Sequence, residues 1–495
     1  RGFDESRLLT NQDQQAAPSQ DASAQPAMSV PAHFRWFTVS VQAFVAVLYY
    51  GIASAPLAFA ALMYAGVQSG DISIEIALQT SFIVGFAAWP GMLGLSILVK
   101  WVVIGRYKPG RYPVWGGYFL RWWIATRFQA LSFSYIFVGT PLMNLYYRAM
   151  GAKVGTNVSL STPYCTAFDV VSIGDNTSIG LESQLLGYRV EDGFLVIAPV
   201  EIGSDCFVGM HCAVGLDTAM EDGARLDDMS LLPDNSVVPT GEGWKGAPAR
   251  KAAVTVPEPQ KKQASGLRRF TFAVLHLLSI YAMGYFLIAA VLPAIVILAL
   301  AYQTWGLAGA LPSVLIAIPV SMAVYTLGVV IITRLLRERG EENIPLHSGR
   351  YLRHWFLAYM LENTKTILNS AYATIYFPTL MRALGAKVGK GSEVSTVSHM
   401  TPHLLEVGAG CFLADACIVG GHRIHGGTME IGKVRIGDKT FIGNSALVPG
   451  SVNIGSNTLI GVCSTPPTGV TNVPDDTRWL GSPSFELPRT QQGYC

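Results

Sequence analysis

Between residues 436 and 461, hydrophobic side chains recur at every sixth position. The stretch IGDKTFIGNSALVPGSVNIGSNTLIG places an aliphatic residue at each step of this period: Ile436, Ile442, Val448, Ile454 and Ile460. An α-helix would repeat at about 3.6 residues and a plain strand at about two, so neither explains the spacing. A fixed six-residue period is typical of a parallel β-helix, in which each hexapeptide forms one side of a triangular coil. We therefore expect these side chains to stack inside one prism.

The repeat region occurs twice along the chain. The matching segments share a constant offset of 234 residues: GAKVG at 151–155 and 385–389, and EIGSDCFVG at 201–209 with RIGDKTFIG at 435–443. Self-similarity of this kind indicates a tandem duplication. We expect two left-handed parallel β-helices, at 151–250 and 385–485.

Each predicted β-helix is preceded by long stretches without Asp, Glu, Lys or Arg: 36–70 and 76–99 before the first, and 270–333 before the second. A helix needs roughly 20 apolar residues to cross a bilayer core of about 30 Å. We therefore expect transmembrane hairpins at 34–106 and 268–335. Arg and Lys flank their outer ends, which predicts that these ends and both β-helices are cytoplasmic. The fold class is thus membrane α plus β-solenoid.

The remaining segments connect these parts. Aromatic side chains and arginines at 107–150, and the matching stretch at 336–384, indicate helices that lie in the membrane interface or, alternatively, cover the open ends of the β-helices. Polar segments rich in Pro, Gln, Ser and Lys are expected to be linkers: 1–33, 251–267 and 486–495.

Composition agrees with this plan. Half of the residues are hydrophobic and 14% are charged, which is typical of membrane spans combined with a Gly-rich repeat fold. The net charge is only +2, and no basic patch interleaved with aromatics is present, so nucleic acid is not an expected partner. Cysteines occur six residues apart, as Cys206 with Cys212 and Cys411 with Cys417. We interpret them as reduced, buried small residues.

The coupling of hexapeptide repeats to membrane hairpins resembles the membrane-anchored carboxy-terminal region of ε-poly-lysine synthetase-type nonribosomal peptide synthetases. RAMGAKVG and RALGAKVG at the entries, GYRVEDG and GGHRIHGG inside the repeats, and WKGAPAR and WLGSPSFELPR at the exits carry the resemblance. It covers about residues 34–490. It implies adenylation and carrier domains on a longer chain, a phosphopantetheine arm that carries an aminoacyl thioester, an amino-acid substrate, and a place in the cell (inner) membrane.

Insertions interrupt the repeats at 187–200 and 420–434, and inserted loops often build the binding site of a solenoid. The second insertion contains His422 and His425. Hexapeptide acyltransferases, which the repeats resemble, usually use a histidine as general base, and an imidazole titrates near neutrality. Either histidine is therefore a candidate catalytic base. The alternative is that both are solvated loop residues.

Adding the offset pairs these histidines with Tyr188 and Glu191 in the first copy, which has neither imidazole. The second β-helix is therefore the expected catalyst. Arg189 and Arg423 align between the copies and are candidates to bind a carboxylate or phosphate. Tyr188 and Glu191 are the further substrate-binding candidates.

Several other polar residues are expected to have structural roles. His211, beside a repeat glycine, is expected to be a corner residue, and Glu182 and Asp192 are expected on exposed faces. His399 and His403 could combine with the insertion histidines on a metal, but zinc needs convergent imidazoles. The spacings are not those of the zinc-binding β-helix enzymes, so no metal is expected.

Three functions remain open at the level of sequence. The first is a condensation module that joins a carrier-bound aminoacyl thioester to an amino-acid amine. The second is a coenzyme-A-dependent acetyltransferase that acts on a membrane-associated glycan or lipid. The third is a non-catalytic scaffold of an export assembly.

Overall fold

A computed structural model describes residues 31–256, 264–337 and 343–488. Most of the predicted linker 1–33 lies outside the described residues, as do parts of the other two linkers and Cys495.

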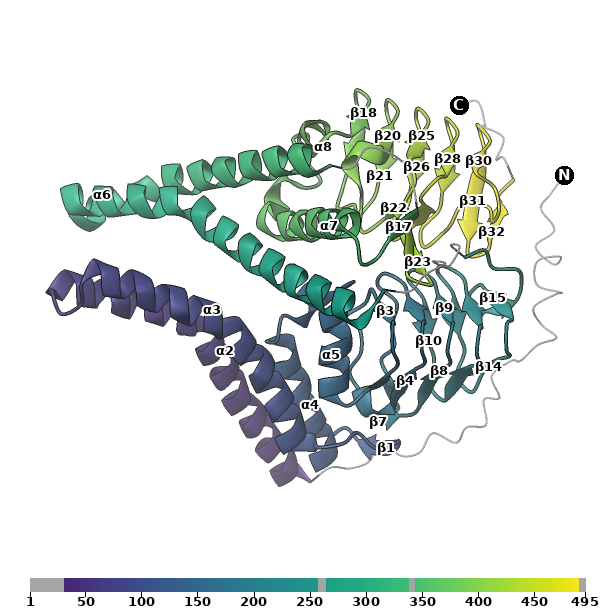
Figure 1. Cartoon of the computed structure of the whole chain (residues 1–495), viewed down its shortest axis with the longest axis horizontal. Helices are drawn as coiled ribbons and strands as arrows, with labels where there is room; N and C mark the ends of the chain where they lie inside the picture. The colour runs from purple at the N-terminus through teal and green to yellow at the C-terminus, as the bar shows by residue number, and fades with distance from the viewer. Residues whose placement is uncertain (1–30, 257–263, 338–342, 489–495) are drawn as a thin grey trace.

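Long helices alternate with stacks of short strands along the chain (Figure 1). The helices are α2 (Ala32–Ser69), α3 (Ile74–Val99), α4 (Gly117–Ala130), α5 (Pro141–Met150), α6 (Gly266–Leu336), α7 (Gly349–Ile367) and α8 (Phe377–Leu384). A π-helical turn at Lys100–Ile104 continues α3, and short 3-10 turns lie at Ser134–Phe137, Phe168–Val170, Asn369–Ala371 and Pro402–Leu404.

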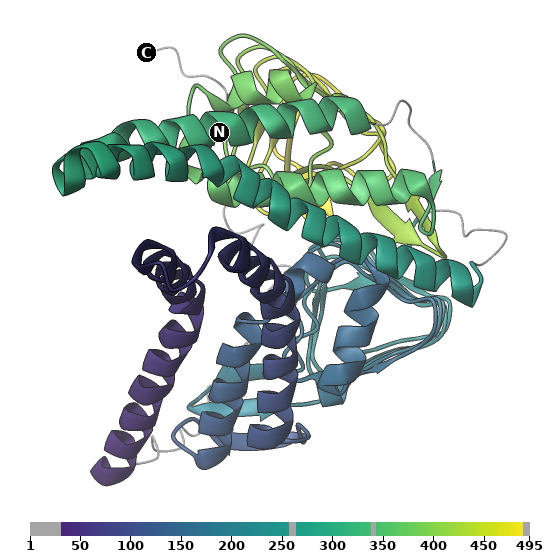
Figure 2. The same cartoon turned by 60° about the vertical axis from the view of Figure 1, so that its left-hand side comes forward.

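Within the described residues, three helices are long and apolar enough to cross a membrane: His33–Ser69, Ile74–Ile104 and Gly266–Leu336. The last of these, α6, is two helical arms, because Gly306 has non-helical dihedrals of φ 62° and ψ −153°. This break falls in the QTWGLAGALP stretch. Figures 1 and 2 show both β-helices at the same end of the apolar helices.

The first β-helix is built from short strands: β2 (Lys153–Val154), β3 (Ser159–Leu160), β4 (Val171–Ile173), β5 (Ser178–Ile179), β8 (Val200–Ile202), β9 (Phe207–Val208), β10 (Ala213–Val214), β11 (Thr218–Met220), β12 (Arg225–Leu226), β13 (Leu231–Leu232), β14 (Val237–Val238), β15 (Gly243–Lys245) and β16 (Arg250–Lys251). They form sheets in the orders β14-β11-β8-β4-β2, β16-β15-β12-β9-β5-β3 and β10-β13. The pairs are parallel except at β16, which pairs antiparallel with β15.

The second β-helix repeats this plan with β18 (Lys387–Val388), β19 (Glu393–Val394), β20 (Leu405–Val407), β21 (Phe412–Leu413), β22 (Ile418–Gly421), β25 (Val434–Ile436), β26 (Phe441–Ile442), β27 (Leu447–Pro449), β28 (Asn453–Ile454), β29 (Leu459–Ile460), β30 (Asn472–Val473), β31 (Arg478–Gly481) and β32 (Ser484–Glu486). Its sheets have the orders β18-β20-β25-β28-β30, β19-β21-β26-β29-β31-β32 and β22-β27.

The period of six is confirmed by the packing of this second β-helix. Ile436 pairs in register with Ile454, and Ile442 with Ile460, while Val448 pairs with β22. These side chains are at most 3% exposed and belong to one buried cluster. Stacked aliphatic side chains inside the prism therefore hold successive coils together through apolar burial.

Each insertion forms an antiparallel hairpin that an earlier strand extends. In the first copy, β6 (Tyr188–Glu191) pairs with β7 (Phe194–Ile197), and β7 also pairs with β1 (Gly110–Pro113). In the second copy, β23 (Arg423–His425) pairs with β24 (Thr428–Glu430), which also pairs with β17 (Asn343–Pro345). The strands β1 and β17, which follow the long apolar helices in sequence, thus each pair with the insertion of the β-helix in the same copy.

The short helices α5 and α8 cover the first coils of the two β-helices. Met143 of α5 and Phe377 of α8 are both 0% exposed, and each belongs to the apolar cluster of the β-helix that follows it. Of the two interpretations of 107–150 and 336–384, this packing favours helices that cover the open ends.

The two β-helices lie against each other, joined by α7 (Figure 1). Tyr351 donates its hydroxyl hydrogen bond to the carbonyl of Gly139 at 2.5 Å, and the Trp355 indole donates to the carbonyl of Val138 at 2.8 Å. A small apolar cluster also crosses the junction: Leu181, Met210, Ile418 and Leu447. This junction brings residues far apart in sequence to one cavity.

Candidate active site

A cavity of about 420 Å³ lies at the junction of the two β-helices. Its polar lining comes from both copies and from α7: Glu182 from the first β-helix, His354 and Glu362 from α7, and His399 and His422 from the second. Its apolar wall includes Tyr135, Leu287, Trp355 and Tyr359. A mostly apolar cavity with a few convergent polar groups is the usual form of a ligand site.

A carboxylate held by two imidazoles forms the centre of the polar wall. Glu182 accepts a hydrogen bond from His211 Nε2 at 2.6 Å through one oxygen and from His399 Nε2 at 2.9 Å through the other. The contact with His399 joins residues 217 positions apart, one from each β-helix. An Nε2 that donates to Glu182 leaves Nδ1 of the neutral ring as the proton acceptor.

These three residues are placed by the corners of the β-helix coils. Glu182, His211 and His399 have positive φ angles of 56°, 54° and 51°. Asn176 and Asp205 occupy other corners at φ 57° and 55°, as expected because short polar side chains tolerate this region best. A glutamate at such a corner is less usual, and its backbone conformation costs energy that the fold must offset.

A second carboxylate lies on the other side of His399. Glu362 accepts a hydrogen bond from the His399 backbone N–H at 3.0 Å, and its Oε1 is 3.9 Å from His399 Nδ1. Lys365 pairs with Glu362 at 2.7 Å and donates to the Ser398 hydroxyl at 2.8 Å. The imidazole of His399 is therefore hydrogen-bonded to Glu182 through Nε2 and has Glu362 at 3.9 Å from Nδ1.

Both carboxylates are charged in the folded chain. Burial disfavours the Glu182 anion, but the hydrogen bonds from His211 and His399 outweigh it and hold the Glu182 pKa well below its usual range. Burial also opposes ionisation of Glu362, yet electrostatic interaction with His399 and Lys365 lowers the Glu362 pKa. Lys365, which also lines the cavity, is paired with Glu362, so Glu182 is the carboxylate of this wall that no lysine or arginine among the described residues offsets.

His422 and His354 form a neutral pair of imidazoles on the same wall, with ring centroids 5.4 Å apart. Burial, helped by His403, lowers the pKa of His354 to about 4. Burial also lowers the pKa of His422 well below its usual value, with His354 and His399 adding to the effect. A general base works best with a pKa near the working pH, so His422 is suited to orienting a substrate more than to taking its proton.

The structure separates the other predicted site residues from this cavity. His425 is 8% exposed and lies edge-on to Phe207, at a centroid distance of 5.9 Å. It does not line the cavity. Its catalytic role, and that of His422, stay predictions.

The two aligned arginines make ion pairs within the protein. Arg423 crosses between the copies to Asp228 at 2.5 Å and Asp227 at 3.2 Å. Arg189 pairs with Glu191 at 2.9 Å and Asp234 at 2.5 Å on an exposed face.

The side chain of Tyr188 packs on Trp122 at a centroid distance of 4.9 Å. The structure therefore gives Arg423, Arg189, Tyr188 and Glu191 contacts within the fold, and their role in substrate binding stays a prediction.

The sequence predicts no contact among Glu182, His211 and His399, because each lies at a corner of a different coil. A comparison of the two copies does distinguish these three residues, because none of them is repeated in the other copy. Their counterparts at the 234-residue offset are Ala416, Ser445 and Cys165. Each copy therefore holds ionisable side chains that the other lacks, as expected if the two copies contribute different parts of one site.

The side chains that line the cavity are of the types that take part in acid–base chemistry. Within the ranges that the structure describes, no group of three or more His, Cys, Asp and Glu side chains is arranged to hold a metal ion. The groups available are a histidine with an oriented tautomer, two carboxylates and neutral imidazoles.

Sequence comparison gives one informative relative. Over 442 residues, 84% of this chain, the sequence is 32% identical to the delta-poly-L-ornithine synthetase of Acinetobacter baumannii (strain AB307-0294). The chain is similar to part of a synthetase. It spans about a third of that relative's length, 32%. No protein-family profile matches the chain.

Solved structures with partial likeness include several acetyltransferases. A hexapeptide-repeat acetyltransferase from Vibrio cholerae shares 13% identity, with 33% of this chain and 91% of that chain covered and a TM-score of 0.21. A maltose O-acetyltransferase from Clostridium difficile 630 shares 14% identity, with 22% and 73% covered and a TM-score of 0.18.

Proposed function

We propose that the chain is the acyltransferase-type, amide-forming part of a longer synthetase. It would act as a condensation module of a nonribosomal peptide synthetase and join a carrier-bound aminoacyl thioester to an amino-acid amine. The observation that carries the proposal is His399, hydrogen-bonded to Glu182 and 3.9 Å from Glu362 in the cavity between the two β-helices. The similarity to a poly-ornithine synthetase supports amide formation as the reaction.

His399 is the proposed general base. Its Nδ1 takes a proton from the attacking amine, and Glu182 fixes the tautomer and stabilises the imidazolium that forms. The amine nitrogen forms the C–N bond of the amide as the C–S bond of the donor breaks. The proton then passes from His399 to the departing thiolate.

We propose that the Glu182 carboxylate favours an acceptor that carries positive charge, since Lys365 already offsets the charge of Glu362. Glu362 and Glu182 are both anionic, and an amino acid with a second amino group presents a cation to Glu182. The relative's name specifies polymerised L-ornithine. We therefore propose a diamino acid as the acceptor.

We propose that the arm of an upstream carrier domain also binds in this cavity. Leu287, Trp355 and Tyr359 offer an apolar wall to a pantetheine chain. When bound, phosphopantetheine supplies the acyl group as an activated thioester. We further propose that the apolar helices cross the cell (inner) membrane and keep both β-helices on its cytoplasmic side.

The direct test is turnover by the full chain reconstituted in lipid vesicles. The donor is an ornithyl-pantetheine thioester, the acceptor is free ornithine, and amide product is measured by mass spectrometry. We expect His399→Ala to lower the rate of amide formation by about 10²–10⁴-fold, the usual contribution of a general base. His425→Ala is compared in the same assay: with His399 as the base, this variant retains wild-type turnover, because His425 does not line the cavity, whereas the prediction from sequence expects a loss.

Three results would contradict the proposal. Equal loss in both variants would mean that His399 has no special role. Acetyl transfer from acetyl-CoA to a glycan, with no amide product, would favour the acetyltransferase alternative. A wild-type chain that assembles in the vesicles but transfers no acyl group would favour the non-catalytic scaffold.

A further inference from the structure

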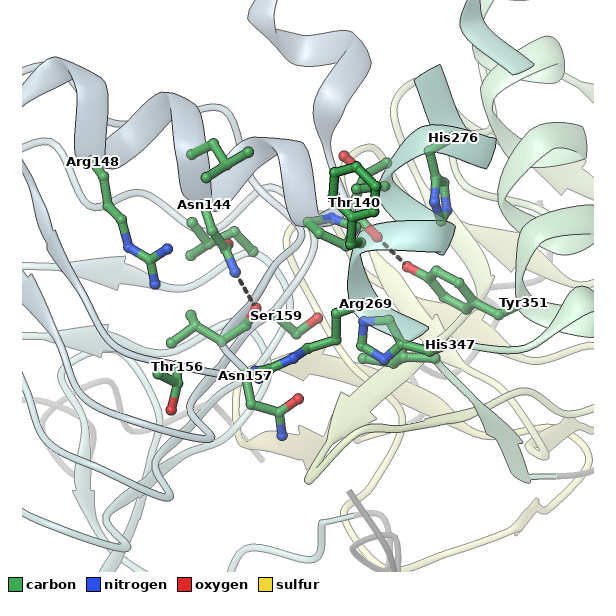
Figure 3. Close-up of a pocket in the computed structure, with 18 residues that line it drawn as sticks. Thr140, Asn144, Arg148, Thr156, Asn157, Ser159, Arg269, His276, His347 and Tyr351 are labelled. Carbon is green, nitrogen blue, oxygen red and sulfur yellow. Dashed lines mark hydrogen bonds between the residues drawn. The ribbon is translucent and has the colours of Figure 1, made fainter. Parts of the chain in front are cut away.

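A second cavity, of about 350 Å³, lies between the first β-helix and the start of α6. Figure 3 shows Asn144 and Arg148 of α5 on one side of it, and His276 of α6 with His347 on the other. Arg269 extends from α6 toward Asn157 of the first coil (Figure 3). None of these residues takes part in the proposed reaction.

The positive charge of this cavity comes from its two arginines. Among the described residues that line it are Arg148, Arg269, His276 and His347, but no Asp or Glu. Arg148 donates to the carbonyls of Val154 and Gly155, and its charge interacts with that of Asp175, which does not line the cavity. Burial together with the neighbouring arginines lowers the pKa of His347 to about 4, as expected for an imidazole in a positive environment.

Two acceptor atoms on the wall lack a hydrogen-bond partner among the described residues. Asn144 uses its amide N–H to donate to the Val158 carbonyl at 2.7 Å, and its Oδ1 is buried and unpaired. His276 is 1% exposed, with Nδ1 bonded to the Phe272 carbonyl at 2.6 Å and Nε2 unpaired. Unpaired buried polar atoms are rare in folded proteins, and a ligand can satisfy them.

The rim of the cavity is apolar. Leu145 and Phe270, which line it, are 56% and 67% exposed. Phe270 lies in the first turns of α6, a helix apolar enough to cross a membrane. An interior lined by two arginines beneath an exposed apolar rim complements a molecule with an anionic head group and a hydrophobic tail.

We propose that this cavity binds the head group of an anionic, hydroxyl-bearing membrane phospholipid, of the phosphatidylglycerol class. Arg269 and Arg148 hold the phosphate, because a guanidinium matches phosphate oxygens in charge and geometry. Hydroxyl groups of the head donate to the unpaired acceptors on the wall. Leu145 and Phe270 contact the acyl chains. The proposal rests on the apolar helices lying in a membrane and is independent of the reaction proposed above.

Binding can be measured on the full chain in a zwitterionic detergent. Short-chain dioctanoyl phosphatidylglycerol is titrated, and its dissociation constant is compared with that of dioctanoyl phosphatidylcholine. We expect phosphatidylglycerol to bind at least about tenfold more tightly, and Arg269→Gln to remove most of this preference, since a charge-assisted contact to phosphate contributes about a factor of ten or more. Equal affinity for the two lipids, or an unchanged preference in Arg269→Gln, would overturn the proposal.

The duplication offers a control for folding effects. Arg382 donates to the carbonyls of Val388 and Gly389, as Arg148 does to those of Val154 and Gly155, but it does not line the cavity. Arg148→Gln should weaken phosphatidylglycerol binding, whereas Arg382→Gln should not. Equal weakening in both variants would contradict a direct contact. Displacement of the lipid by inorganic phosphate as readily as by phosphatidylglycerol would assign the cavity to free phosphate instead.

Discussion

At the scale of single residues, the duplication separates structural roles from functional ones. Arg189 and Arg423 occupy equivalent positions, yet Arg189 lies on an exposed face with its side chain 47% exposed, and Arg423 lies at the junction with 22%. Their acidic partners differ as well: the Asp228 side chain bound by Arg423 is 4% exposed. Equivalent residues therefore have different structural roles once the two copies pack together.

Replacing each arginine by methionine compares the contributions of the two ion pairs to the free energy of unfolding. Arg423→Met leaves the largely buried carboxylates of Asp227 and Asp228 without their cation, which costs about 3–5 kcal/mol when a buried pair is broken. Arg189→Met removes an exposed pair, for which about 0–1 kcal/mol is usual. Denaturant unfolding of the purified chain compares the two free energies of unfolding. Similar values for both variants would show that Arg423 does not hold the copies together.

The buried histidines predict how stability depends on pH. The folded pKa of His354, about 4, is below its ordinary value of 6.5, so the unfolded chain binds the proton first as the pH falls. The stability due to this group is complete above pH 6.5 and is lost between pH 6.5 and 4, by roughly 3 kcal/mol. The melting temperature should fall less steeply between pH 6.5 and 4 in His354→Gln than in the wild type. An identical pH dependence in wild type and variant would contradict a neutral, buried His354.

At the scale of elements, the sequence predicts the repeated coils and the long helices. It does not predict the contacts that form where the two β-helices pack against each other. The rung residues follow from their period, because each coil places the same position in the interior. The apolar stretches likewise predict the long helices, and the break in α6 lies where Gly306 interrupts them. The pairing of Glu182 with His399 has no such period, since the two corners meet only when two separately built prisms pack together.

A rung residue should contribute more to stability than a corner residue of similar size. Ile442 is 0% exposed in the second β-helix, and Val462 is 56% exposed at a corner. Ile442→Ala should lower the free energy of unfolding by about 2–5 kcal/mol, through lost burial and a residual cavity. Val462→Ala should change it by less than about 0.5 kcal/mol. Equal effects would argue against an interior column at this position.

At the scale of the whole molecule, the proposed topology places both β-helices on one side of a membrane and the α2–α3 loop on the other. Cys463 is an exposed cysteine of the second β-helix, and Asp71 lies in the loop. An impermeant thiol reagent added outside intact cells should label Asp71→Cys in a Cys463→Ser chain, but not Cys463 in the wild type. Labelling of both positions from outside would contradict the proposed orientation.

The central claim is that the two copies build one reaction site, with Glu182 from the first and His399 from the second. A double-mutant cycle on the rate of amide formation tests it most directly, because residues that act as a unit show strongly non-additive losses. We predict that Glu182→Gln combined with His399→Ala is no slower than His399→Ala alone. Losses that multiply in the double variant would show that the two residues act independently and would contradict the account.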